Sequence, residues 1–211
     1  MTRAGKVDRI TINFLKDLQL AIASRAVFEG VQVEKIRYVA ALDISYSSRG
    51  SRSAAIVWDC EAKNITEVKT LESKPFFPYI PGYLFIREAP QMIAAFKSLE
   101  SKTDLILVDG HGIAHPRRAG LAVFVGMLLD QPTLGVAKSL LVGEVGESSD
   151  LLIPIRLQES TVGFAMKADE TKRIYISPGY KVSLQNISEV VEHIGPEYIL
   201  KIIRMADRYS R

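Results

Sequence analysis

Residues 36–73, IRYVAALDISYSSRGSRSAAIVWDCEAKNITEVKTLES, decide the fold of this 211-residue chain. Runs rich in strand-forming residues alternate here with short polar turns, and we expect strands at IRYVAALDISY, SAAIVWD and ITEVKTLES. Links of only a few residues cannot hold a crossover helix, so the three strands are predicted to form an antiparallel meander. This excludes a doubly wound sheet, which needs a helix between successive strands.

The segments on either side of the meander alternate between helical and strand patterns. Apolar residues close to a 3.6-residue period predict a helix over 8–29 that ends at Gly30, and further helices over 89–100 and from Ser188 to Arg208. Apolar runs predict strands at DLILV, TLGVA, LLIPIRL, TVGFAMK and RIYISPG, with another helix in GLAVFVGMLLD. A meander that continues into βαβ units gives an α/β fold with a mixed sheet and helices on both faces, which is the architecture of ribonuclease-H-like proteins.

The composition is that of an ordinary globular protein. Apolar residues make up 47% and charged residues 24%, which excludes a disordered, collagenous or low-complexity chain. The single cysteine, Cys60, cannot form an intramolecular disulfide, and no apolar run approaches the roughly 18 residues of a membrane span. We therefore expect one domain over residues 1–211, a cytoplasmic location and no membrane contact. The net charge of +3 permits a polyanionic partner but is weak evidence for one.

Three acidic residues stand where strands or a shaped loop end. Asp43 follows the run YVAAL, Asp109 follows LILV, and Glu88 begins the expected helix after a proline-rich loop. Residues at the carboxyl ends of neighbouring strands converge on one crevice, where three carboxylates would repel one another unless divalent cations neutralised them. Such hard oxygen ligands suit Mg²⁺ or Mn²⁺, and the site could clamp a phosphodiester. Taken singly, each acid is more often a helix cap or a turn residue than a ligand.

Basic and aromatic residues accompany these acids. DGHGIAHPRR places His115 close to the third acid, and Lys138 follows the strand TLGVA. Either side chain could hold water or phosphate, although His115 could equally shape a loop and unpaired surface lysines are common. In the loop PFFPYIPGY, residues 75–83, three prolines hold Tyr79 on a stiff frame. There it could wedge into a base stack or simply pack against proline.

In order and in spacing, several strings resemble the motifs of the endonuclease V family: ALDISY, PFFPYIPGYLFIREAP, LVDGHGIAHPRRAGLA, LGVAKSLL and YISPGYKVSL. The likeness extends from the N-terminal helix to the closing MADRYSR. It implies a ribonuclease-H-like enzyme that uses Mg²⁺, with Mn²⁺ as a substitute, to cut nucleic acid near deaminated adenine. We expect the protein to be a monomer, although no sequence feature decides its oligomeric state. Family members recognise hypoxanthine (inosine) in DNA, and some also in RNA. They hydrolyse the second phosphodiester bond 3′ of the lesion and leave 3′-hydroxyl and 5′-phosphate ends.

The resemblance also assigns roles residue by residue. The metal-binding acids of the family match Asp43, Glu88 and Asp109. The other functional positions match His115 and Lys138 near metal and phosphate, Tyr79 as the wedge, and Gly82, Leu84, Gly110 and Leu121 around the base. Phe124 and Tyr180 stand where many members carry histidine, which bears on rate, metal preference and the choice between DNA and RNA rather than on the reaction class.

Two other classes of function stay open at this point. One is another nuclease of the same fold, such as a ribonuclease directed at inosine in RNA, a ribonuclease H or a junction resolvase. The other is a non-catalytic inosine-binding module. The proline-rich aromatic loop argues against a resolvase or a ribonuclease H, and the three retained acids argue against a loss of catalysis.

Overall fold

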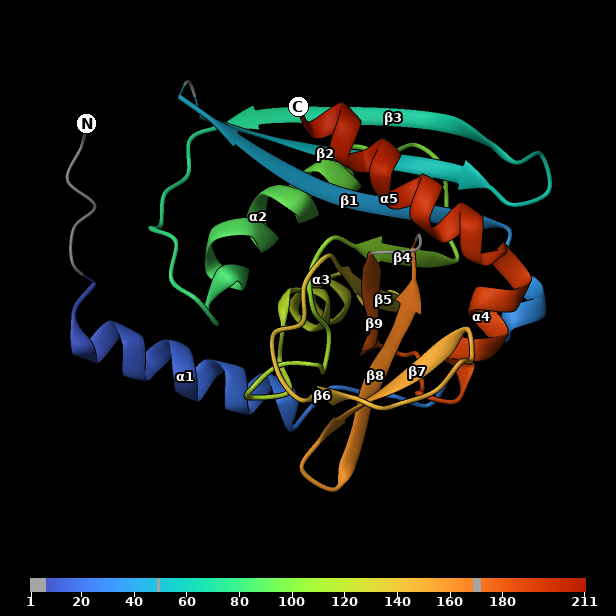
Figure 1. Ribbon diagram of the computed structural model, residues 1–211. Helices are drawn as coiled ribbons and strands as arrows, with labels where there is room; N and C mark the ends of the chain where they lie inside the picture. Colours follow the sequence, from blue (N-terminus) through green and yellow to red (C-terminus); the bar gives the residue numbers. More distant parts are fainter. Residues whose placement is uncertain (1–6, 49, 169–171) are drawn as a thin grey trace.

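A nine-stranded mixed sheet runs through the computed structural model (Figure 1). The structure describes residues 7–48, 50–168 and 172–211. The strand order is β3-β2-β1-β4-β5-β9-β8-β7-β6. The predicted antiparallel meander is confirmed, and its strands are β1 (Tyr38–Ser47), β2 (Gly50–Asp59) and β3 (Asn64–Ser73).

The sheet continues from β1 first with parallel and then with antiparallel strands. β4 (Leu105–Val108) pairs parallel to β1, and β5 (Thr133–Ala137) pairs parallel to β4. The antiparallel strands beyond β5 are β9 (Arg173–Tyr180), β8 (Ser160–Lys167), β7 (Leu152–Leu157) and β6 (Glu144–Val145). Of these, the sequence pattern missed only β6, because two residues are too few to show an alternation.

Helices cover both faces of the sheet. The bounds on one face are α1 (Arg9–Ala23), α2 (Leu84–Lys97) and α3 (Leu121–Leu129), and on the other η1 (Val33–Lys35), α4 (Asn186–Ile194) and α5 (Pro196–Ser210). The expected ribonuclease-H-like architecture, a mixed sheet between two helical layers, is therefore confirmed. Within the described ranges, no helix is long and apolar enough to cross a membrane.

The central strands bury both of their faces, which explains why their sequences are continuously apolar. Val39 and Ala41 of β1 belong to the core under α4 and α5, whereas Ala40 and Leu42 belong to the core under α1, α2 and α3. Successive side chains of a strand point to opposite faces, so such a strand needs apolar residues at every position. The same alternation fixes the face on which each polar residue at the strand end appears.

The first helix is shorter than the sequence predicts. It ends at Ala23, so the prediction that it continues to residue 29 is wrong. The side chains of Ser24 and Arg25 both donate to the carbonyl oxygen of Ala21, at 2.9 and 3.1 Å. Because these side chains satisfy a carbonyl of the last turn, the chain can leave the helix before it reaches a glycine.

Helix α2 begins and ends earlier than the predicted range 89–100, which is therefore wrong. That prediction placed Pro90 in the first turn, where proline is favoured, but Pro90 lies inside the helix. A tight turn at Gly82, with φ +78°, aims the chain into the helix directly after the proline-rich loop. Glu88 consequently lies in the second turn of α2 and not at its start.

The last predicted helix, Ser188 to Arg208, is in fact two helices, so the prediction of one continuous element is wrong. Gly195 separates them with φ +91°, and Pro196 is the first residue of α5. Glycine accepts the positive φ that ends α4, and proline is well suited to the first position of a new helix. The break lets α5 cross β1 and β2, so that the C-terminus lies over the end of the meander (Figure 1).

Candidate active site

Three carboxylates from distant parts of the sequence meet at one end of the sheet. Asp43 and Asp109 directly follow the last residues that pair β1 with its parallel neighbour β4. Asp207 belongs to the last turn of α5. One oxygen of each side chain lies within 4.8 Å of the others, so the three residues could share a cation. The structure thus brings together two of the acids that the strand-end argument selected and adds a third.

Glu88 approaches this group from the other face of the sheet. Asp43 continues the alternation that points toward α5, whereas Glu88 lies on α2 and is only 7% exposed. The hydroxyl of Tyr46 donates to Oε1 of Glu88 at 3.0 Å. Burial raises the pKa of Glu88 to about 7, and the charges of Asp43 and Asp109 add to the rise against the effect of Tyr46. Glu88 is therefore close enough for the charges of Asp43 and Asp109 to affect its pKa, although it is not one of the three carboxylates that could share a cation.

Repulsion between the acids is countered by Lys138 at the end of β5. Its Nζ lies 2.6 Å from Oδ2 of Asp109 and 3.0 Å from Oδ1 of Asp207. Burial raises the pKa of Asp109, and the nearby charge of Asp43 raises it further. Burial lowers the pKa of Lys138, but the hydrogen bonds and charges of Asp109, Asp207 and Asp43 together outweigh this effect and raise the pKa. Lys138 thus remains a cation at the centre of the group.

The donor set fits a hard divalent cation such as Mg²⁺ or Mn²⁺. Its members are carboxylate oxygens, which these ions prefer over nitrogen or sulfur. The charges of the acids exceed the single charge of Lys138, and buried like charges are costly unless they are neutralised. Asp43 is already oriented, because the Ser210 hydroxyl donates to its Oδ2 at 2.6 Å. A divalent cation would balance this arrangement.

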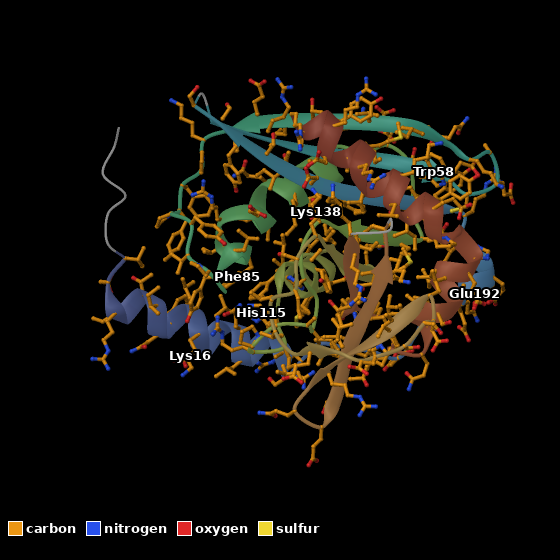
Figure 2. All side chains as sticks on the ribbon, in the orientation of Figure 1. Lys16, Trp58, Phe85, His115, Lys138 and Glu192 are labelled. Atoms are coloured by element: carbon orange, nitrogen blue, oxygen red, sulfur yellow. The ribbon has the colours of Figure 1, made fainter. Side chains whose placement is uncertain are left out.

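A cavity of about 280 Å³ opens beside the acids, and Asp109 and Lys138 form part of its wall. The residues expected around a base all line it, and they are Gly82, Leu84, Gly110 and Leu121. Tyr79 also lines it and is 66% exposed, which fits a side chain at the mouth of the cavity. Figure 2 places Lys138 between α2 and α5, with Phe85 and His115 nearer to α1. One hollow therefore adjoins both the acids and the predicted base-contacting residues.

Two histidines line the same cavity. The Nε2 atom of His115 lies 3.2 Å from the carbonyl oxygen of Gly82, and its Nδ1 accepts from the Arg117 amide at 3.2 Å. Nδ1 of His111 is buried without a hydrogen-bond partner in the described part of the chain. Burial lowers the pKa of each ring to about 4, so both are neutral at pH 7. The ring of His115 is thus committed to the loop around Gly82 rather than to the acids.

The two departures from the family pattern lie in different surroundings. Phe124 is buried on α3 and stacks on Phe85 with ring centroids 3.8 Å apart. Because Phe85 lines the cavity, Phe124 supports the cavity wall from behind. The hydroxyl of Tyr180 donates to Asp130 at 3.3 Å, at the C-terminal end of α3 and apart from the acids.

Sequence reasoning missed Asp207, although the closing string MADRYSR contains it. A weak signal was present, because a negative charge in the last turn of a helix interacts unfavourably with the helix dipole. Such a residue is expected to have a neighbouring cation or a functional role. Gln19 was missed as well: it is 1% exposed on α1 and lines the cavity. A buried glutamine on an amphipathic helix cannot be told from a surface glutamine without the tertiary structure.

Known proteins resemble this chain over most of its length. The family model described as Endonuclease V matches residues 21–208. A protein named Endonuclease V from Desulfurococcus amylolyticus is 41% identical over 87% of this chain and 84% of its own length. One of the same name from Sulfolobus acidocaldarius is 37% identical over 95% of this chain and 94% of its own length.

Solved structures agree with this match. The crystal structure of Endonuclease V from Streptomyces avermitilis has a TM-score of 0.85 and 28% identity, and covers 94% of this chain and 91% of its own. A Ciona intestinalis Endonuclease V carrying D234N, solved with a DNA that contains inosine followed by a ribo-adenosine, has a TM-score of 0.84 and 25% identity over 97% of both chains. By fold, by motif and by overall similarity, this chain belongs to the endonuclease V family of nucleases.

Proposed function

We propose that this chain is a metal-dependent endonuclease that recognises hypoxanthine in nucleic acid. The observation that carries the proposal is that the cavity and the acidic group share residues. Asp109 is a member of the acidic group, Lys138 pairs with it, and both line the cavity. A base held in the cavity would have its own strand next to the acids. The Ciona intestinalis relatives solved with inosine-containing DNA support this choice of base.

The bond cut would be the second phosphodiester 3′ of the lesion, with 3′-hydroxyl and 5′-phosphate products, as family membership implies. DNA is the proposed substrate, with inosine-containing RNA as the alternative to be tested. Action as a monomer is part of this proposal.

Asp43, Asp109 and Asp207 would hold the cation, with Glu88 completing the set from the α2 side. When bound, such a cation supplies Lewis-acid activation of water and neutralises charge at the phosphodiester. Lys138 can exchange its contact with Asp109 for a phosphate oxygen and so hold the strand in place.

Supporting residues restrict the positions of these carboxylates. The Ser210 hydroxyl fixes one oxygen of Asp43, and the Tyr46 hydroxyl fixes one oxygen of Glu88. A carboxylate held in this way keeps its remaining oxygen available for the cation or for water. The geometry around the scissile phosphate is therefore set by the protein before substrate binds.

The direct test uses end-labelled oligonucleotides that carry one inosine, as DNA and as RNA, incubated with Mg²⁺, with Mn²⁺ and with a chelator. We expect one nick, at the second phosphodiester bond 3′ of the inosine, in the presence of either ion and no nick in the presence of the chelator. Cleavage of RNA alone would reassign the substrate. Tight binding to inosine without cleavage in either ion would show a binding module, and preferred cleavage of junctions or hybrids would show another nuclease of this fold.

Tyr79→Ala is expected to lower the preference for an inosine duplex over a normal duplex by roughly tenfold, because stacking by an aromatic wedge contributes about 1.4 kcal/mol. The preference is measured by competition binding with unlabelled duplexes. Phe76→Ala is the matched control: Phe76 is 61% exposed in the same loop but does not line the cavity. Equal losses in both variants would contradict a wedge role for Tyr79.

A further inference from the structure

The carbonyl oxygen of Gly82 is held by three side chains from outside its own loop. It accepts hydrogen bonds from Nε2 of Gln19 at 3.0 Å and from Nη2 of Arg117 at 2.7 Å. The Nε2 atom of His115 lies 3.2 Å away. A carbonyl oxygen has two lone pairs, so three donors saturate it and fix its direction.

The hydrogen on the histidine follows from its second nitrogen. The amide of Arg117 donates to Nδ1 of His115 at 3.2 Å, so Nδ1 has no hydrogen and Nε2 of the neutral ring carries it. His115 therefore donates to Gly82, as the other two side chains do. The lowered pKa of His115, caused by burial, keeps the ring in this neutral form at physiological pH.

Gln19 connects the two loops that form the cavity. Besides its bond to Gly82, its Nε2 donates to the Ala119 carbonyl at 2.9 Å. Its Oε1 accepts from Nε of Arg117 at 2.5 Å, and the Arg117 guanidinium lies 4.4 Å from the ring centre of Tyr83. The side-chain amide of Gln19 thus uses both of its donors and its acceptor, and it does so while almost fully buried.

We call the side chains of Gln19, Arg117 and His115 that bind the Gly82 carbonyl the clamp. The clamp affects which backbone groups can bind a ligand in the cavity. The Tyr83 amide, on the same peptide unit as the Gly82 carbonyl, donates to the Ile80 carbonyl at 3.0 Å, so the whole peptide unit is fixed. Helix α2 starts with the next residue, and its first two residues, Leu84 and Phe85, line the cavity. The start of α2 has no side-chain cap, so its backbone N–H groups stay available as donors.

We propose that Gln19, acting through Gly82 and Arg117, is a positioning residue that sets the base selectivity of this cavity. The inference rests on the proposed function. Because side-chain donors already occupy the Gly82 carbonyl, it is not free to accept a hydrogen bond from the base, whereas the N–H groups at the start of α2 remain free to donate. N–H donors suit the 6-oxo group of hypoxanthine and oppose the 6-amino group of adenine. A loosened loop could turn carbonyl acceptors toward the base and accept the amino group.

Gln19→Met tests this, because methionine has nearly the same length and removes all three hydrogen bonds. We expect the ratio of inosine-duplex to adenosine-duplex affinity, measured by competition, to fall about tenfold. Arg117→Lys, which keeps the charge but cannot bridge Gly82 and Gln19 together, should lower the ratio in the same direction.

Leu15→Ala is the matched control. Leu15 and Gln19 are the two buried residues of α1, and the apolar side chain of Leu15 packs in the core without making any of the hydrogen bonds that hold the Gly82 carbonyl. We expect Leu15→Ala to lower the melting temperature while leaving the affinity ratio unchanged. An equal fall of the ratio in this variant, or an unchanged ratio in Gln19→Met, would overturn the inference. A parent protein that does not prefer inosine would instead overturn the proposed function.

Discussion

Asp109→Asn is expected to reduce cleavage of inosine-containing DNA by roughly 10³-fold, the size of effect seen when one preorganised charge is removed from a reacting centre. Asp109 contacts Lys138, belongs to the group of three carboxylates and lines the cavity, so it is placed to act on both cation and substrate. Asparagine keeps the shape and one oxygen but not the charge. Single-turnover rates at saturating cation measure the loss.

The folding stability of this variant separates catalysis from structure. Because Asp43 and Asp109 repel each other, removal of one charge should leave the melting temperature equal to or above that of the parent. Asp130→Asn serves as control, since Asp130 is an exposed cap of α3 paired with Lys181. Parent-like turnover in Asp109→Asn would remove Asp109 from the mechanism.

Asp207→Asn is expected to reduce cleavage by roughly 100-fold at low cation concentration, because the site would lose one anionic ligand. High Mg²⁺ should recover part of the rate, since the remaining carboxylates still form a weaker site. The measurement is a titration of the single-turnover rate with Mg²⁺ and with Mn²⁺. Its readout is the cation concentration that gives half of the maximal rate.

The control for this variant lies on the same helix. Glu197→Gln removes an acid from the first turn of α5, at the end of the helix opposite Asp207. We expect its cation dependence to match that of the parent. If Asp207→Asn also shows the parent's cation dependence at every concentration, then Asp207 is a partner of Lys138 and not a ligand.

The architecture was predictable because the strand signals were local. The meander follows from three strand-forming runs joined by links too short for a helix. Helix ends were less predictable, because they depend on contacts that distant residues make or on caps that several residues could provide. The end of α1 at Ala23 depends on the side chains of Ser24 and Arg25, and a glycine further along offered an equally good stop signal.

The site was predictable to the extent that strand topology dictates it. Asp43 and Asp109 each follow an apolar run, and residues at the carboxyl ends of neighbouring strands converge, which predicted their proximity. The structure shows that the two strands are parallel neighbours. Asp207 and Gln19 had no comparable signal. Each lies on an amphipathic helix, and tertiary packing sets how that helix lies against the sheet. The position of Asp207 also depends on Gly195, because the helix that carries it begins directly after this glycine.

By itself, the sequence indicated the mixed sheet, from strand signals that are local, and the edge at which Asp43 and Asp109 gather, from the order of the strands. Only the tertiary structure decided that Asp207 joins the acids and that Gln19 clamps the Gly82 carbonyl. The physical reason is that the hydrogen bonds of Gln19 join segments 63 and 100 residues apart, and the group of carboxylates joins Asp43 to Asp207, which are still farther apart in the chain. Both depend on how helices pack, which no local pattern records.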